Sequence, residues 1–240
     1  MQAANSPKPA DVQRLFDKLA FRYDLFNRLV SFGMVKSWRS KVLERIPEGS
    51  RVLDVGCGTG DLSLGAAQKT GSSGEVVGLD FSARMLEVAR RRYELSGQSL
   101  NGHFKLVQKG AEELPLNEKP FDIVLSGFVL RNLYERIDRV LEGVLRSLKT
   151  GGRALLLDFT EPSSPLAAGL FRFHMNTFGA LYGRLLFGKD FPAGYMAESA
   201  RRFPKPEAFL DKMRAAGFEE VKAERFFMGS VVLYSGRRPS

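Results

Sequence analysis

The sequence contains very little cysteine and no long apolar run. Its single cysteine, Cys57, excludes an intrachain disulfide framework, and no Cys-x-x-Cys or Cys/His cluster indicates a structural metal site. The first residues, 1–9, lack the apolar stretch of a signal peptide, and no run reaches the roughly 18 apolar residues that a membrane-spanning helix needs. We therefore expect a reducing, cytoplasmic environment, no bound metal and no membrane span.

Acidic residues are scarce relative to basic ones: 27 Asp and Glu stand against 36 Lys and Arg, a net charge of +9. Residues 1–50 and 161–240 each carry +4, whereas 51–160 carry +1, and 19 of the 26 aromatic residues lie in the two flanks. Such an excess of basic residues is compatible with binding to nucleic acid, with attraction to an anionic membrane, or with a role in solubility alone. The run Arg90-Arg91-Arg92 comes with no nucleic-acid motif, so we interpret it as a solvated helix end and expect no nucleic-acid partner.

The length and the composition, 44% hydrophobic and 26% charged, are typical of one globular domain, 1–240. Apolar runs predict strands at 51–55, 76–80, 104–107, 121–126 and 153–159, and helical patterns predict helices at 61–70, 83–95 and 135–148. Apolar strands separated by helices indicate an α/β fold with a parallel sheet covered on both faces. Ser82 is the expected N-cap of the second of these helices.

The two ends of the chain have different patterns. Residues 11–46 predict two helices with a bend near 31–33, and residues 206–216 predict a further helix. The alternating runs 221–226 and 231–234 predict an antiparallel hairpin, while 165–195 is aromatic-rich without a clear period. We therefore divide the chain into an N-terminal helical cap (1–50), a core (51–160) and a C-terminal region (161–240).

The first predicted strand runs into Gly56-Cys57-Gly58-Thr59-Gly60 and then a helix, which turns unpaired backbone N–H groups toward a ligand. In the dinucleotide fingerprint G-x-G-x-x-G, the third glycine falls where this chain has Asp61, and a carboxylate there repels a pyrophosphate. This disfavours a nicotinamide dehydrogenase. S-adenosylmethionine has no phosphate, and Asp54 is placed for its ammonium and Asp80 for its two ribose hydroxyls.

With these residues, the chain resembles the class I S-adenosylmethionine-dependent methyltransferases, and more closely the UbiE/MenG family, the C-methyltransferases of menaquinone and ubiquinone biosynthesis. The resemblance runs from about Val12 to Gly236. Beyond the glycine loop it is carried by Phe16-Asp17, Ala20, Tyr23-Asp24, Asn27, Ser31-Phe32-Gly33, Trp38, Leu130-Arg131-Asn132, Lys149, Gly151-Gly152-Arg153, Tyr195, Glu198-Ser199 and Phe203-Pro204. It implies a Rossmann-like α/β fold with a mostly parallel seven-stranded sheet, helices on both faces, an N-terminal helical cap and a C-terminal antiparallel hairpin.

The resemblance also implies chemistry: C-methylation of a prenylated quinol ring by S-adenosylmethionine without a metal. Demethylmenaquinol is the first candidate substrate and 2-polyprenyl-6-methoxybenzoquinol the second. The implied cofactor-binding residues are Asp54, Gly56, Gly58, Thr59, Gly60, Asp80, Phe81, Met85, Gly110, Ala111 and Gly127. The core is then the cofactor-binding region, and residues 161–240 cover the substrate.

The implied catalytic residues lie outside the glycine loop. Arginine is always protonated, so we expect Arg131 to stabilise the developing phenolate or to hold a water that accepts the proton. Asn132 is expected to orient the ring, and Tyr23 and Asp24 to close the site and accept or relay the proton.

Three matters stay open in the sequence. Val35 and Gly110 depart from the family pattern and keep another small-molecule or phospholipid methyltransferase as the alternative, beside a catalytically inactive cofactor-binding module. Residues 165–187 hold more apolar side chains than one buried helix face needs, which indicates a lipid-tail tunnel or a surface resting on a membrane. With the basic flanks, this predicts peripheral association with the anionic inner face of the cytoplasmic membrane; a homodimer and a monomer fit the sequence equally.

Overall fold

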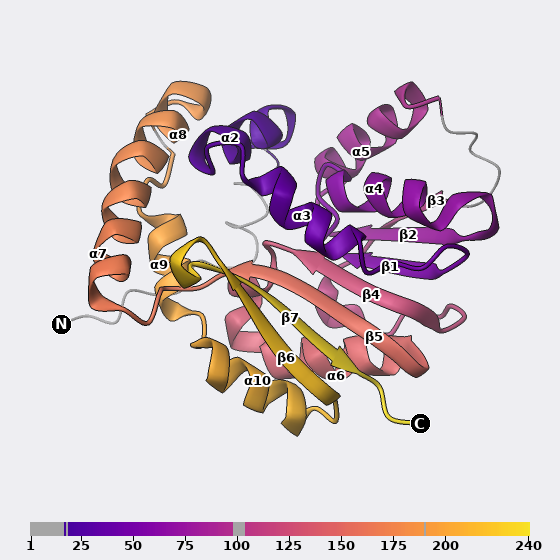
Figure 1. The fold of residues 1–240 in the computed structure, drawn as a ribbon. Helices are drawn as coiled ribbons and strands as arrows, with labels where there is room; N and C mark the ends of the chain where they lie inside the picture. Colours follow the sequence, from indigo (N-terminus) through magenta and orange to yellow (C-terminus); the bar gives the residue numbers. More distant parts are fainter. Residues whose placement is uncertain (1–16, 18, 98–103, 190) are drawn as a thin grey trace.

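A computed structural model describes residues 17, 19–97, 104–189 and 191–240. Seven strands form one sheet in the order β3-β2-β1-β4-β5-β7-β6 (Figure 1). The strands are β1 (Arg51–Val55), β2 (Glu75–Asp80), β3 (Phe104–Gln108), β4 (Phe121–Gly127), β5 (Leu148–Phe159), β6 (Glu219–Phe226) and β7 (Val231–Arg237). Strands β1 to β5 pair in parallel, and β7 inserts antiparallel between β5 and β6. The predicted mostly parallel seven-stranded sheet with a C-terminal hairpin is confirmed.

Helices pack on both faces of this sheet. Leu53 and Val55 of β1 enter the core formed with α6 (Ile137–Ser147) and α10 (Pro206–Ala215), whereas Val52 enters the opposite core. That second core is closed by α3 (Val35–Leu43) and α4 (Asp61–Thr70). Successive residues of the central strands are therefore all buried, which explains their unbroken apolar sequence.

The expected helix boundaries are reproduced closely. The Ser82 hydroxyl accepts the Met85 N–H at 3.1 Å, which makes it the N-cap of α5 (Ala83–Leu95) as predicted. In the cap, α2 (Tyr23–Val30) and α3 are separated by the turn at 31–34, so the two-helix prediction holds over the described residues. Residues 11–16 of the expected first helix lie outside the described residues.

The C-terminal region contains helices that the sequence pattern did not reveal. Its elements are α7 (Pro165–His174), one π-helical turn (Met175–Gly179), α8 (Ala180–Phe187) and α9 (Tyr195–Arg202). The π turn adds a residue to one turn and breaks the 3.6-residue period, and apolar side chains lie on both faces, so no amphipathic pattern was visible.

A third core joins these helices to the N-terminal cap, and Figure 1 shows α2 beside α8. Its buried members are Leu19, Phe26, Val30, Phe171, Met175, Phe191, Ala197 and Ala200. Two flanks that are remote in sequence thus form one helical layer at the carboxyl ends of the strands. Among the described residues, no helix combines the length and apolar character needed to cross a bilayer.

Candidate active site

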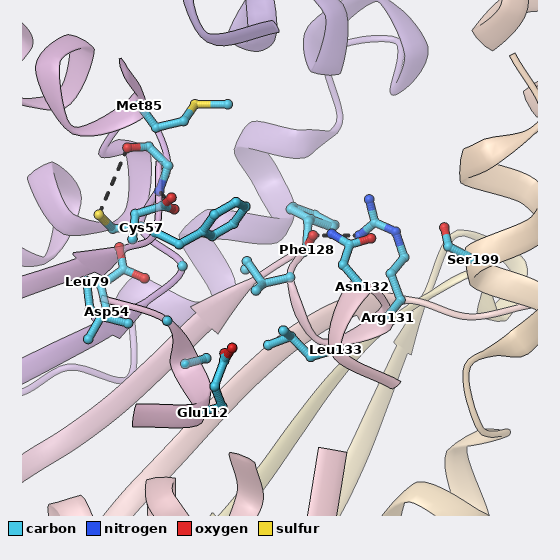
Figure 2. Close-up of a pocket in the computed structure, with 18 of the residues that line it drawn as sticks. Asp54, Cys57, Leu79, Met85, Glu112, Phe128, Arg131, Asn132, Leu133 and Ser199 are labelled. Carbon is cyan, nitrogen blue, oxygen red and sulfur yellow. Dashed lines mark hydrogen bonds between the residues drawn. The ribbon is translucent and has the colours of Figure 1, made fainter. Parts of the chain in front are cut away.

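A cavity of about 480 Å³ lies at the carboxyl ends of β1, β2 and β4, bounded by residues of α2, α3 and α9. Strand order reverses between β1 and β4, and open α/β sheets leave a crevice at such a point. Figure 2 shows Asp54 and Cys57 on one side of the cavity, with Arg131, Asn132 and Ser199 on the other. We call these sides the glycine-loop end and the arginine end.

All but one of the residues predicted to bind the cofactor line this cavity. They are Asp54, Gly56, Gly58, Thr59, Asp80, Phe81, Met85, Gly110, Ala111 and Gly127. The exception, Gly60, is the N-cap of α4 in the left-handed conformation, with φ of 86°. Its place is therefore to turn the loop into the helix, because an L residue rarely adopts that φ.

Two glycines give the loop its shape. A Cβ on Gly56, whose φ is +70°, would lie 2.5 Å from Val129, so only glycine lets the loop pass that side chain. Gly58 has φ of +54° and no heavy atom within 4 Å of its Cβ position. Since Gly58 lines the cavity, that space is available to a ligand lying against the backbone.

Two buried carboxylates flank the loop. Asp80 accepts the Gly58 N–H at 2.8 Å through Oδ2 and the Ser82 N–H at 2.9 Å through Oδ1, which fixes its plane. Asp54 accepts the Ser63 hydroxyl at 2.5 Å through Oδ2, while its buried Oδ1 has no hydrogen-bond partner among the described residues. Burial raises the pKa of Asp54 to about 7, and it also raises the pKa of Asp80.

At the arginine end, Arg131 is held as a buried ion pair. Its Nη1 donates to Asp158 Oδ1 and to the Phe128 carbonyl, each at 2.7 Å, and its backbone N–H donates to Asp158 Oδ2 at 3.0 Å. Burial alone would lower the pKa of Arg131, but Asp158 together with Tyr23 and Tyr195 raises that pKa above its ordinary value. Arg131 is therefore a fixed cation at the cavity wall, 6% exposed.

Two tyrosines accompany this cation. The Tyr195 hydroxyl donates to Asn132 Oδ1 at 2.9 Å, and Tyr23 reaches the same cavity from α2. Burial raises the pKa of both phenols, although Arg131 opposes the rise, so both are neutral near neutral pH. Tyr195 is not among the predicted catalytic residues, and its only signal in the sequence is its place in the family-like segment near the C-terminus.

Asp24 is placed differently from its neighbour Tyr23. It does not line the cavity but accepts the Thr59 hydroxyl and Arg92 Nη1, both at 2.8 Å. Arg92 also donates to Asp61, which pairs with Arg39 of α3. Asp24 thus ties α2 to the glycine loop.

The same network changes the interpretation of the run Arg90-Arg91-Arg92. Arg90 and Arg91 are exposed, but Arg92 is half-buried and bonded to Asp24, to Asp61 and to the Thr59 carbonyl. The prediction of a fully solvated run is therefore wrong at Arg92. Burial opposes ionisation of Asp61, but Arg39 and Arg92 hold its pKa below the usual value.

Comparison with known proteins decides the family. The model of the ubiE/COQ5 methyltransferase family matches residues 1–238. The chain belongs to this family. The ubiquinone/menaquinone biosynthesis C-methyltransferase UbiE of Azotobacter vinelandii is 36% identical over 98% of this chain and 92% of its own length. The protein of the same name from Ectopseudomonas mendocina is 37% identical over 98% and 91%.

Membership of the ubiE/COQ5 family makes the chain an S-adenosylmethionine-dependent methyltransferase, and solved structures agree on the fold. A protein of Thermotoga maritima, described as an S-adenosylmethionine-dependent methyltransferase and possible histamine N-methyltransferase, has a TM-score of 0.64 at 22% identity and covers 94% of this chain and 99% of its own. The [4+2]-cyclase SpnF has a TM-score of 0.69 at 18% identity, with 98% and 97% covered. Because a cyclase shares the fold, the fold alone does not fix the chemistry.

The two departures from the family pattern lie in different places. Val35 is buried at the start of α3 in the core under the sheet, away from the cavity. Gly110 lines the cavity, where an added Cβ would lie 2.7 Å from the movable Glu112 carboxylate. Neither Val35 nor Gly110 lies among the polar residues of the arginine end.

Proposed function

We propose that this enzyme transfers the methyl group of S-adenosylmethionine to a ring carbon of a prenylated quinol, demethylmenaquinol first and 2-polyprenyl-6-methoxybenzoquinol second. The names of the curated relatives support the quinone pathway. The observation that carries the proposal is a single cavity with a glycine loop at one end and a buried, permanently charged arginine at the other. No feature of the site favours a phospholipid headgroup instead.

The glycine-loop end fits the cofactor. Asp54 Oδ1 is a buried acceptor that no described residue bonds, which suits the ammonium of an amino acid. Asp80 holds its carboxylate in a fixed plane and has lone pairs left for ribose hydroxyls, and Gly58 leaves room for the ligand. When bound, the cofactor supplies a methyl group that is electrophilic because it is attached to a sulfonium. No metal is required.

The arginine end acts on the quinol. The ring carbon becomes nucleophilic as the neighbouring hydroxyl loses its proton to water, and Arg131 stabilises the phenolate that develops. Transfer of the methyl group would form the new C–C bond as the C–S bond breaks, leaving S-adenosylhomocysteine. The methylated ring carbon would then lose its hydrogen to water as a proton, and the ring oxygen would regain a proton, which restores the aromatic quinol. Asn132, oriented by Tyr195, holds the ring in line, and the neutral Tyr23 of α2 donates a hydrogen bond to the quinol at the same end of the cavity. We assign Asp24 to holding α2 closed over the loop.

The test is direct. Purified enzyme is incubated with S-adenosylmethionine and either short-chain quinol under reducing conditions, and the product is examined by mass spectrometry for one added methyl group on ring carbon. Phosphatidylethanolamine serves as the competing acceptor. Methylation of neither quinol, or preferential methylation of the phospholipid, would overturn the proposal.

We further propose that the enzyme works in the cytoplasm at the inner membrane face, because a prenylated quinol resides in the bilayer. The basic flanks support attraction to anionic lipid rather than to nucleic acid.

A further inference from the structure

The outer face of the α7–α8 helix carries an unusual row of exposed apolar side chains. We call this row the outer stripe; it comprises Leu166, Leu170, Phe173, Phe178, Leu181 and Leu185. Leu166 is 73% exposed and Leu185 is 70% exposed. The spacing is three or four residues except for five between Phe173 and Phe178, where the π turn lies. The extra residue of that turn keeps the stripe on one face.

A second apolar row lies on the neighbouring cap. Phe21, Leu25 and Phe32 are exposed at helical spacing, with exposed Arg28 between the last two. The Phe32 ring lies 6.4 Å from that of Phe178, so the two rows meet. Phe32 has φ of 50°, an uncommon conformation for a bulky residue, and it directs a large apolar side chain into solvent. Figure 1 shows α2, α7 and α8 together along one edge of the molecule.

The charges around these rows have one sign. No acidic residue occurs between Glu161 and Asp190, whereas Arg172, Arg184 and Lys189 do. Arg28, Arg184 and Lys189 make no ion pair within the described part of the chain. In α2 the acidic Asp24 is already bonded to Thr59 and Arg92. Over the described residues, an apolar surface with cations outside ion pairs and no unpaired acidic side chain beside them is complementary to an anionic lipid surface.

The positive charges around the two apolar rows disfavour a second copy of this chain as the partner that covers them. A two-fold interface would place each row against its own equivalent and bring Arg28 and Arg184 toward like charges. A bilayer instead accepts the apolar side chains among its acyl chains and the cations among its phosphates. The rows also adjoin the site: on α2, exposed Leu25 stands two residues from Tyr23, which lines the cavity.

We propose that the outer stripe, together with Phe21, Leu25 and Phe32 of the cap, is the surface that docks on an anionic bilayer. This inference rests on the proposed function, because a prenylated substrate is dissolved in that bilayer. Docking places α2, one wall of the cavity, against the lipid that contains the substrate, so the quinol ring has a short path from bilayer to site.

The experiment is flotation of the purified full-length enzyme with vesicles of phosphatidylglycerol mixed with phosphatidylcholine, or of phosphatidylcholine alone. Wild type is expected to bind the anionic vesicles about tenfold more strongly, and less so at high salt. Replacing two stripe leucines, Leu181→Glu with Leu185→Glu, should weaken binding by about tenfold or more. The matched control is Leu95→Glu: Leu95 is 87% exposed on α5, outside the stripe, and its replacement should leave binding unchanged.

Activity on a short-chain, water-soluble quinol separates this inference from the proposed function. The double variant should keep wild-type activity on that quinol, which also shows that it folds, and lose activity only on a long-chain quinol in vesicles. The docking surface is overturned if wild type does not float, if Leu95→Glu and the double variant lose binding equally, or if sedimentation velocity shows a dimer that the double variant abolishes. If the wild-type enzyme floats with anionic vesicles but methylates neither quinol, the proposed function is overturned while the docking surface is still supported.

Discussion

The two ends of the cavity are built by different means. At the glycine-loop end, the polar groups come from one stretch of the chain, from Asp54 to Asp80, at the ends of two adjacent strands. Two backbone N–H groups fix Asp80, and the hydroxyl of Ser63, nine residues away, fixes Asp54. At the arginine end they come from α2, the segment after β4 and α9, and are fixed by side chains: Asp158 holds Arg131, and Tyr195 holds Asn132. The first end is a local motif and the second is a product of tertiary packing.

This difference predicts that mutations at the arginine end change the rate, whereas mutations at the glycine-loop end change the affinity for the cofactor. The sharpest test is Arg131→Lys. Lysine keeps a positive charge beside buried Asp158 but lacks the rigid guanidinium plane from which Nη1 donates to both Asp158 and the Phe128 carbonyl. We expect kcat to fall about 100-fold or more, because the developing phenolate loses its fixed cation, while the Kd for S-adenosylmethionine changes less than about threefold.

The matched control is Arg136→Lys, since Arg136 also lines the cavity but is exposed and pairs with Glu112. It should alter kcat less than about threefold. Single-turnover rates and equilibrium binding are measured for both variants, with thermal unfolding to show that they fold. Parallel losses of rate and cofactor affinity in Arg131→Lys would contradict the proposed division between the two ends.

A second, smaller effect is expected at the opposite end. Asp80→Ala removes the acceptor of the Gly58 and Ser82 N–H groups together with the proposed ribose contact. Hydrogen bonds to a charged group contribute about 1.5 to 3 kcal/mol, so the Kd for S-adenosylmethionine should rise about 10- to 100-fold, with kcat at saturation little changed. Isothermal titration measures the Kd.

Asp122→Ala is the control for this variant. The Asp122 carboxylate also accepts a backbone N–H, from Arg51 at 2.8 Å. It lies near the start of β4, at the amino end of the parallel strands and away from the cavity. Its replacement should leave cofactor affinity unchanged. If Asp122→Ala weakens binding as much as Asp80→Ala, the effect is a general loss of sheet structure and not a loss of ribose contact.

The third and smallest effect is a pH dependence that originates at Asp54. Burial raises the pKa of this carboxyl to about 7 in the ligand-free protein, and the proposed ammonium contact requires the ionised form. Affinity for S-adenosylhomocysteine, which has the same amino group, should therefore fall as the pH drops below about 7, approaching tenfold per pH unit. Titrations from about pH 6 to about pH 8 measure it, and Asp54→Asn should remove the dependence.

Folding stability should respond to Asp54 with the opposite sign. Because the folded-state pKa lies above the ordinary value of 3.8, the folded protein holds this proton more tightly than the unfolded chain. The Asp54 contribution to the free energy of unfolding therefore becomes less unfavourable as the pH falls from about 7 toward about 4. Equal pH dependence of binding in wild type and Asp54→Asn would assign the titration to another group.

Much of the fold could be predicted from residue patterns. Apolar strands alternating with helices predicted the parallel sheet, and Ser82 marked a helix start through its local hydrogen bond. The helices α7 and α8 could not be predicted in this way. Their apolar residues divide between a buried face and an exposed stripe, and the π turn between them shifts the period, so periodicity alone does not distinguish them from a loop.

The two ends of the candidate site also differ in how far they could be predicted from the sequence. The lining of the glycine-loop end could be predicted from the sequence, because its residues lie a few positions apart or at the ends of adjacent strands. The hydrogen bond between Tyr195 and Asn132, 63 residues apart, and the ion pair between Asp158 and Arg131 arise from tertiary packing. Packing of α2 likewise brings the Asp24 carboxylate to Thr59 and Arg92. Side-chain contacts between distant segments depend on how whole helices pack, and no local pattern records that packing.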